Sequence, residues 1–466
     1  MIKKKIEEEI KMLDSIIKNG KVVTHTDVLE ADVAIENGII AAIGYNLGQA
    51  KEVIDAKGNY VMPGCIDPHN HIGMFVDYNG DLKSETGAGL IGGNTMMMQC
   101  GVGNYPIMDV VKMMKDPIKS YAYGDVGMYA ALLTDDDLTK IPELSAMGIN
   151  SYKFFLAYKG KFAESIGLMN CNIDNGYLYE GIKEIKKVGG LPMFHAENVE
   201  MVVRVEPEFR HTNTLKTWAD ARPNIAEEID FFTACEIAEF LKSPIYQVHS
   251  SVARVTDIAR EFRLRGNKVY MEGMPQYCIL DYEGKNLKEP LLGKINPPIR
   301  SHKDRDGCLE NLKRGEYDVL ATDSANSMYA DKKKDGNIWN MILDWSSAGL
   351  MLPLVLSEFV NKGHLTMPDV VRMSSYNTAK IHGYAPKKGM LAPGSDADII
   401  IVDLNKTKKL SAKTTPSWSD WCLYEGWELK GWPVLTMLRG KVVVKDDKLL
   451  VEPGFGEFVK SQPAYK

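Results

Sequence analysis

The sequence predicts an α/β fold: a (β/α)8 barrel of the TIM type with a small β-sandwich domain formed by the N- and C-terminal segments. Three observations lead to this prediction. The middle of the chain alternates short β-rich runs with helix-like stretches, and the pattern repeats eight times. Both ends of the chain contain short strands joined by hairpin signals. The length of 466 residues favours one large domain plus a smaller one over a single core.

The two ends of the chain are assigned to the sandwich. Residues 15–62 contain short apolar runs broken by Gly and Asn, and residues 388–466 repeat this style in GSDADIIIVD and LRGKVVVKDDKLLV. The barrel then covers residues 63–387. Residues 1–14 are assigned to an N-terminal amphipathic helix, which we interpret as a solvated cap or an oligomer contact rather than a membrane anchor. Its apolar residues recur at helical spacing up to position 17: Ile2, Ile6, Ile10, Leu13 and Ile17.

Eight β-rich runs are expected to form the barrel wall, and the first ends at Asp67. Helix-like stretches such as YEGIKEIKKVG and IAEEIDFFTACEIAEFLK separate them. A doubly wound open sheet is the alternative, but no Gly-x-Gly-x-x-Gly follows the first strand to support a nucleotide-binding fold. The remaining expected strands are NTMMMQC, VGMYAALL, SYKFFLAY, GLPMFHA, SPIYQVHS, NKVYMEG and YDVLATD.

The composition is that of a globular enzyme, with 45% apolar and 25% charged residues. The net charge of −6 argues against nucleic acid or an anionic membrane as the main partner. No apolar run approaches the roughly 18 residues of a membrane span, and no signal peptide opens the chain. The seven cysteines are scattered without a Cys-x-x-Cys pair, which favours free thiols in a reducing cytoplasm.

Two histidines one residue apart, His69 and His71, follow the first expected strand in VMPGCIDPHNHIGM. In an extended segment, residues i and i+2 point to the same side. Two imidazoles at this spacing can therefore bind one metal ion from the end of a strand. A His-x-His pair is weak evidence by itself, so the interpretation depends on what the other strands contribute.

Four of the other expected strands carry a single His, Lys or Asp at or near the end. Lys153 lies in NSYKFFLAYKG. The expected strands in PMFHAEN, YQVHSS and VLATDS end at His195, His249 and Asp323, respectively. Each has an ordinary explanation, such as a core histidine or a helix N-cap. In a (β/α)8 barrel, however, functional residues come from the C-terminal ends of the strands. The combination therefore predicts a metal site at one mouth of the barrel.

These motifs resemble those of the cyclic amidohydrolases of the amidohydrolase superfamily, nearest the dihydropyrimidinase and hydantoinase branch. The resemblance extends from about Leu13 to the C-terminus. It implies a hydrolase that opens a hydantoin, dihydropyrimidine or related ureide or imide by attack of a metal-bridging hydroxide, giving an N-carbamoyl amino acid or similar product. It is carried by PGCIDPHNH, SYKFFLAYK, FHAEN, QVHSS, MPQYCILD, NPPIR, ATDS, YNTAKIHGYAPKKGMLAPGSDADIIIVD and YEGWELKGWPV.

The resemblance implies two divalent metal ions per subunit. Zn²⁺ suits imidazole and carboxylate ligands, and Mn, Fe or Co are alternatives. In the family the lysine of the SxKxF-type motif is carboxylated, so modified Lys153 (N6-carboxylysine) is expected to bridge both ions. A carbamate supplies anionic oxygens, whereas a free ammonium would be repelled by two dications. The expected ligands are His69, His71 and Asp323 for one ion, and His195 and His249 for the other.

The resemblance also assigns roles in catalysis and substrate binding. Asp323 is expected to take the proton of the attacking water and pass it to the leaving ring nitrogen. Tyr158 is expected to donate a hydrogen bond to the developing oxyanion. Asn296 in NPPIR matches the segment whose backbone binds the amide edge of the ring. Family members are commonly tetramers or dimers, so a homo-oligomer is expected. The residues expected to shape the pocket for the ring substituent are Phe75, Phe155 and Phe162.

Several positions depart from the family pattern. Dihydroorotases usually carry an arginine where this chain has Gly73, which argues against dihydroorotate. Ser324 occupies the position at which the family commonly has His after the aspartate of strand eight. The sequence leaves open which substrate this change favours. An allantoinase is the nearest alternative activity, and a non-catalytic scaffold is an alternative of another class. A mononuclear deaminase is a third, but such enzymes generally lack the lysine at the position of Lys153.

Overall fold

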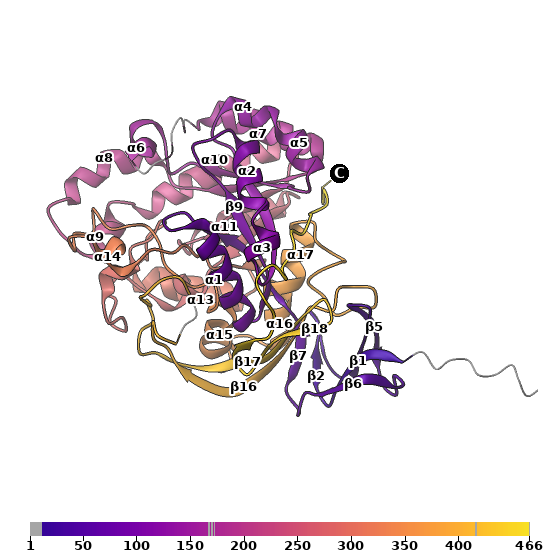
Figure 1. Cartoon of the computed structure of the whole chain (residues 1–466). Helices are drawn as coiled ribbons and strands as arrows, with labels where there is room; N and C mark the ends of the chain where they lie inside the picture. Colours follow the sequence, from indigo (N-terminus) through magenta and orange to yellow (C-terminus); the bar gives the residue numbers. More distant parts are fainter. Residues whose placement is uncertain (1–11, 166–167, 169–170, 172, 415–416, 466) are drawn as a thin grey trace, which may run out of the picture.

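The computed structural model describes residues 12–165, 168, 171, 173–414 and 417–465, and its centre is a parallel β-barrel (Figure 1). Within these residues, eight parallel strands form one sheet in chain order, as the sequence predicts. Helices cover the outside of the sheet. The strands are β8 (Cys65–Asn70), β9 (Asn94–Gly101), β10 (Asp125–Ala131), β11 (Ser151–Phe155), β12 (Leu191–His195), β13 (Ile245–Gln247), β14 (Val269–Gly273) and β15 (Val319–Leu320).

The barrel closes between β8 and the segment that follows β15. Asn70 and Ser324 form a parallel bridge. The backbone N–H of His71 donates to the carbonyl oxygen of Ser324 at 2.8 Å. The hydroxyl of Thr322 donates to Asp67 Oδ2 at 2.6 Å. This seam brings the first and last strands together and so places the segment 69–71 beside Asp323.

Helix α7 shows how capping residues set the ends of a helix in this fold. In α7, the side chain of Asp174 accepts from the backbone N–H of Tyr177, and Gly189 ends the helix with φ of +71°. The helices are α1 (Tyr78–Ile91), α2 (Ile107–Lys115), α3 (Ile118–Tyr121), α4 (Asp135–Thr139), α5 (Ile141–Ala146), α6 (Gly160–Ser165), α7 (Asn175–Val188), α8 (Val199–Phe209), α9 (Leu215–Asp220), α10 (Asn224–Leu241), α11 (Val255–Leu264), α12 (Pro275–Ile279), η1 (Pro290–Gly293), α13 (His302–Lys313), α14 (Tyr329–Lys333), α15 (Met351–Val355), η2 (Leu356–Val360), α16 (Met367–Val371), η3 (Arg372–Tyr376) and α17 (Asn377–Ile381).

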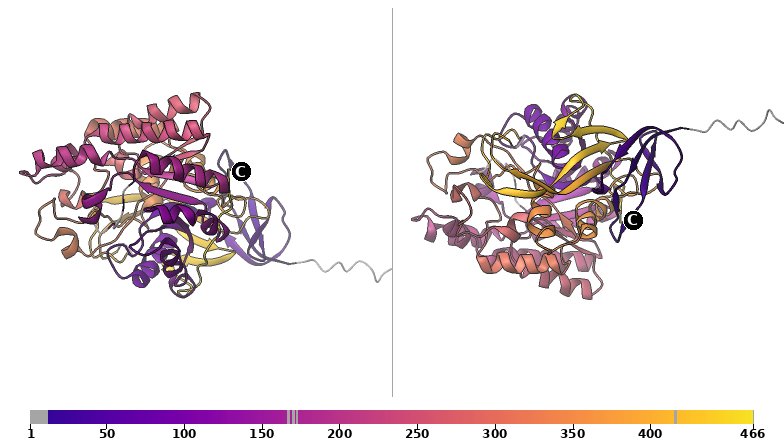
Figure 2. Two further views of the ribbon diagram at one scale, coloured as in Figure 1. Left: turned by 90° about the horizontal axis from the view of Figure 1, so that it is seen from above. Right: turned by 90° about the horizontal axis from the view of Figure 1, so that it is seen from below.

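The two ends of the chain form a β-sandwich beside the barrel (Figure 2). In the described part of the chain, one of its sheets has the order β5-β4-β1-β6 and the other β19-β18-β17-β16-β7-β2-β3. Val61 pairs with Ile401, so N- and C-terminal strands share the larger sheet. The strands are β1 (Leu13–Lys18), β2 (Lys21–Val23), β3 (Val28–Glu30), β4 (Asp32–Glu36), β5 (Ile39–Gly44), β6 (Ala50–Asp55), β7 (Tyr60–Pro63), β16 (Ile399–Lys409), β17 (Glu428–Leu438), β18 (Lys441–Lys445) and β19 (Lys448–Leu449).

The start of the chain corrects one expectation. Residues 1–11 of the expected N-terminal helix lie outside the described residues. Leu13, which counted toward that helix, instead begins β1. This strand pairs with β4 on one side and β6 on the other, and Ile17 is buried in the sandwich core. At Leu13 and Ile17, backbone pairing and burial in a sheet therefore decide the structure, and the helical spacing does not.

Candidate metal centre and substrate cavity

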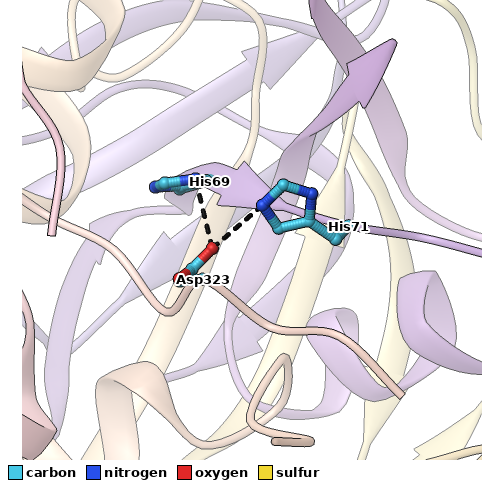
Figure 3. Close-up of side chains that lie close together, drawn as sticks. All are labelled: His69, His71 and Asp323. Atoms are coloured by element: carbon cyan, nitrogen blue, oxygen red, sulfur yellow. Dashed lines mark ion pairs between the residues drawn. The ribbon is translucent and has the colours of Figure 1, made fainter. Parts of the chain in front are cut away.

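Three predicted ligands, His69, His71 and Asp323, converge at the closing seam of the barrel (Figure 3). Their ligand atoms lie within 4.8 Å of one another. Asp323 Oδ1 lies 3.1 Å from His69 Nε2 and 3.0 Å from His71 Nε2. Asp323 has φ of +55°, a conformation that costs energy for a residue other than glycine and is concentrated at functional sites. The last strand thus turns its carboxylate toward both imidazoles.

The other three predicted ligands lie directly beside this group. Lys153, on β11, has its Nζ 3.3 Å from His69 Nε2. His195 ends β12, and its Nδ1 faces Nε2 of His249 at 2.9 Å. The rings of His69 and His249 are 5.4 Å apart between centroids. All six predicted residues therefore meet at one mouth of the barrel.

Burial sets the protonation of most of these groups. It lowers the pKa of His69, His195 and His249, which favours the neutral imidazole that binds metal. Burial also lowers the pKa of Lys153 to about 8, which increases the fraction of neutral, nucleophilic amine at physiological pH. For His71, burial opposes protonation, but the interactions with Asp323 and Cys100 together outweigh burial and raise the pKa to about 9. A metal ion that binds His71 must therefore displace a proton.

The donor set fits divalent metal ions. Nε2 of His249 and Nδ1 of His195 point at each other across 2.9 Å, and Nδ1 of His249 has no hydrogen-bond partner among the described residues. His249 also has a positive φ of 35°. Buried imidazole nitrogens and a carboxylate that converge at this distance are what a borderline cation binds. The arrangement fits metal binding better than it fits a hydrogen-bonded core.

Sequence reasoning missed the carboxylate that orients the imidazole of His69 and holds the backbone of His249. Glu272 on β14 is fully buried, and its Oε1 lies 2.9 Å from His69 Nδ1. The same oxygen accepts from the backbone N–H of His249 at 2.8 Å, and Oε2 accepts from the hydroxyl of Tyr246 at 2.9 Å. A carboxylate on the far nitrogen of a ligand histidine fixes its orientation and tautomer. The signal was the Glu near the end of the expected strand NKVYMEG.

Replacing this supporting carboxylate is expected to weaken metal binding. We expect Glu272→Gln to bind metal about 10- to 100-fold more weakly, the usual effect of losing such a partner. Competition with a metal chelator measures the change. Glu227→Gln is the matched control, because Glu227 is an equally buried carboxylate that instead holds Ser251 and Arg300. Equal metal affinity in Glu272→Gln and the wild-type protein would contradict the role given to Glu272.

Five of the six residues line one part of a cavity of about 1500 Å³, and the sixth, His69, lies behind them against Lys153 and Asp323. Phe75, Phe155, Tyr158 and Asn296 also line this cavity, as the substrate assignments require. Asn296 donates from Nδ2 to the hydroxyl of Tyr158 at 3.2 Å and to Glu197 at 2.8 Å. Phe162 lies in α6, but its side chain lies outside the part of the structure that is described.

The cavity also contains side chains that the sequence analysis did not assign. Arg222, Lys294 and Trp218 are buried and line it on the side of α8 and α9. Nothing in their local sequence marks them, because only the fold brings Lys294, on the segment after η1, to Trp218 on α9 and Arg222 just after it. Ser324 does not line the cavity: its hydroxyl accepts from the backbone N–H of Ser347 at 3.0 Å, which stabilises the closing seam.

A parallel barrel with histidines, a lysine and an aspartate at the carboxyl ends of its strands is the architecture of a metal-dependent hydrolase. Comparison with known proteins identifies the family. Residues 207–443 match the model of the amidohydrolase family. A D-hydantoinase of Geobacillus stearothermophilus is 34% identical, over 96% of both chains. The chain therefore belongs to the amidohydrolase family, in its hydantoinase and dihydropyrimidinase branch.

Two further relatives agree with this placement. A dihydropyrimidinase of Arabidopsis thaliana is 31% identical over 96% of this chain and 85% of its own. A crystal structure of a D-hydantoinase superposes with a TM-score of 0.89 and 32% identity, covering 97% of this chain and 99% of the other. The similarity thus includes the sandwich strands as well as the barrel.

Proposed function

We propose that the protein hydrolyses the amide C–N bond of a hydantoin or dihydropyrimidine ring and releases an N-carbamoyl amino acid. The observation that carries the proposal is the convergence of six ligand-type residues, five of which line one cavity together with Tyr158 and Asn296. Membership of a branch whose relatives are named hydantoinase and dihydropyrimidinase supports this ring class over allantoin. Family membership and the complete set of ligand-type residues also favour an enzyme over a non-catalytic scaffold.

The six residues would hold two divalent ions, for which Zn²⁺ is the best match to imidazole and carboxylate donors. His69, His71 and Asp323 would bind one ion, and His195 and His249 the other. Lys153 would bridge them as a carbamate, formed when its neutral Nζ attacks carbon dioxide and loses a proton. Such ions, when bound, supply a hydroxide at neutral pH and polarise the amide carbonyl.

The protein's own groups then position the ring and move protons. Asp323 accepts the proton of the attacking water and delivers it to the leaving ring nitrogen. Tyr158 donates its hydroxyl hydrogen to the carbonyl oxygen as negative charge develops there. Burial raises the pKa of Tyr158, which keeps the phenol protonated for this role. The backbone at Asn296 binds the amide edge of the ring, and Phe75, Phe155 and Phe162 enclose its substituent.

A panel of rings tests the proposal. We expect zinc-loaded protein to open dihydrouracil, hydantoin or hydantoins substituted at carbon 5, and to do so faster than it opens allantoin or dihydroorotate. Product is measured as the free carbamoyl group. Turnover confined to allantoin would replace the proposal by that activity. Absence of turnover across the panel, in protein with two ions bound per chain, would contradict cyclic amide hydrolysis.

We also propose that the enzyme works in the cytoplasm as a homodimer or homotetramer. All seven cysteines are buried, and scattered buried thiols are consistent with a reducing compartment. Among the described residues, no helix is long and apolar enough to cross a bilayer. Phe240 at the end of α10 and Leu264 at the end of α11 are 76% and 84% exposed. Exposed apolar side chains of this size are consistent with contact between subunits.

A further inference from the structure

The part of the cavity on the side of α8 and α9 contains a group of buried cations that the proposed chemistry does not use. We define the cationic cluster as Arg222, Lys294 and the indole of Trp218 between them. The guanidinium carbon of Arg222 lies 3.4 Å from the centroid of the Trp218 ring, and Lys294 Nζ lies 4.3 Å from it. The three side chains are 1–4% exposed, yet all line the cavity. The indole face thus holds two cations at the cavity wall.

Arg222 has unused hydrogen-bond donors. Its Nη2 donates to Glu206 Oε2 at 3.0 Å. Its Nε and Nη1 have no hydrogen-bond partner among the described residues, although both are shielded from solvent. Buried polar groups are normally satisfied, and a buried guanidinium with free donors is costly. Arginine presents its donors in a planar fork that matches a carboxylate.

Lys294 places a second cation near the expected position of the ring. Its ammonium donates to the carbonyl oxygen of Met341 at 2.6 Å, which uses one of its three donors. Lys294 precedes Asn296 by two residues, and both line the cavity. Two residues of extended chain span about 7 Å. The amine can therefore reach a group attached to a ring that is bound at Asn296.

Two carboxylates, Glu206 and Glu197, lie near Arg222, but neither forms a described ion pair with Lys294. Glu206 lies between Arg222 and Arg210 and forms ion pairs with both. Glu197 hydrogen-bonds to Asn296 and faces His195, and its attraction, with that of Glu206, opposes the effect of burial on the pKa of Arg222. No carboxylate forms a described ion pair with Lys294. Burial, followed by repulsion from Arg222, lowers the pKa of Lys294 to about 6. The attraction of Glu206 is too weak to offset this effect, so a carboxylate placed beside Lys294 would favour its charged form.

We propose that the cationic cluster binds a carboxylate on the substituent of the ring, so that the substrate is an acidic cyclic amide such as a hydantoin with a carboxymethyl or carboxyethyl group. This inference rests on the proposed ring hydrolysis and specifies its substrate class. The carboxylate accepts from the free donors of Arg222 and from the ammonium of Lys294. Gly73 provides no cation beside His71, so the acid group lies on the Asn296 side of the ring and at the end of a short side chain. The product is an N-carbamoyl dicarboxylic amino acid.

A matched pair of substrates isolates the charge. We compare hydantoin carrying a carboxymethyl group at carbon 5 with the isosteric carbamoylmethyl compound, which is neutral. The metal-loaded enzyme is expected to show a kcat/KM for the acid about 10- to 100-fold higher, the range for buried hydrogen bonds to a charged group. Equal or lower kcat/KM for the acid, with the amide turned over, would overturn this inference and leave the proposed hydrolysis intact. No turnover of either ring would refute the hydrolysis, and the inference with it.

Two variants assign the preference to the cluster. Lys294→Met keeps the length of the side chain and is expected to remove most of the preference by lowering kcat/KM for the acid alone. Lys216→Met is the control, because Lys216 lies on the same side of the protein but pairs with Asp220 outside the cavity. An equal loss on both substrates in Lys294→Met would show a structural role and contradict the assignment. Binding of N-carbamoyl aspartate and N-carbamoyl asparagine, measured by calorimetry, should show the same difference without turnover.

Discussion

Lys153→Ala is expected to lower kcat/KM for ring opening at least about 10³-fold, because metal ions contribute several kcal/mol of transition-state stabilisation and each 1.4 kcal/mol is a factor of ten. The Lys153 side chain is fully buried, and its Nζ lies 3.3 Å from His69 Nε2. Without it, the two groups of histidines lose the side chain proposed to join them. Metal analysis of the purified variant should find fewer than two ions per chain.

The matched control for this variant is Lys159→Ala. Lys159 follows the same strand but pairs with Glu200 near the surface, so its loss should leave metal content and turnover unchanged. Modified Lys153 is proposed to supply carbamate oxygens to the metal ions. Added short-chain carboxylates should therefore partly restore the activity of Lys153→Ala. Full activity of Lys153→Ala without such additives would contradict the proposed bridge.

Asp323→Asn is expected to lower kcat about 10²- to 10⁴-fold, the contribution typical of a positioned general acid–base group. The amide keeps the size of the side chain and can still lie against His69 and His71, but it cannot accept the proton of water. Attraction to His69 and the hydrogen bond with His71 hold Asp323 in its ionised form, since they lower its pKa against the effect of burial. The fall should appear in kcat more than in KM.

Asp220→Asn serves as the control for this variant, since Asp220 is a carboxylate on α9 whose partner, Lys216, lies outside the cavity. It should show wild-type kinetics. General acid–base catalysis contributes about 10²- to 10⁴-fold to the rate. If Asp323→Asn kept more than about a tenth of the wild-type kcat, a group other than Asp323 would have to transfer the proton.

The barrel and its ligand set could be predicted because each relies on local sequence. The strands are short apolar runs, and a parallel barrel fixes which end of each strand carries function. His195, His249 and Asp323 each follow such a run directly, so their meeting point followed from the fold class. The sandwich was predictable for a similar reason, since hairpin signals lie at both ends of the chain.

Other features could not be predicted, because they depend on contacts between distant segments. Glu272 orients His69 across the barrel, 203 positions away in the sequence. Arg222 and Lys294 meet only because the segment after η1 packs against Trp218 of α9, whose indole N–H donates to the carbonyl oxygen of Ile295. Local spacing also misled at Leu13, where pairing with two neighbouring strands outweighs the helical pattern.

The most direct test of the central claim is a metal titration of chelator-stripped protein, with the opening of a substituted hydantoin as the readout. The account predicts no turnover without metal and a rise that saturates at two ions per chain. It also predicts that protons are released as metal binds, because His71 must become neutral. Full turnover by the stripped protein, or saturation at one ion per chain, would contradict a two-metal centre built from these six residues.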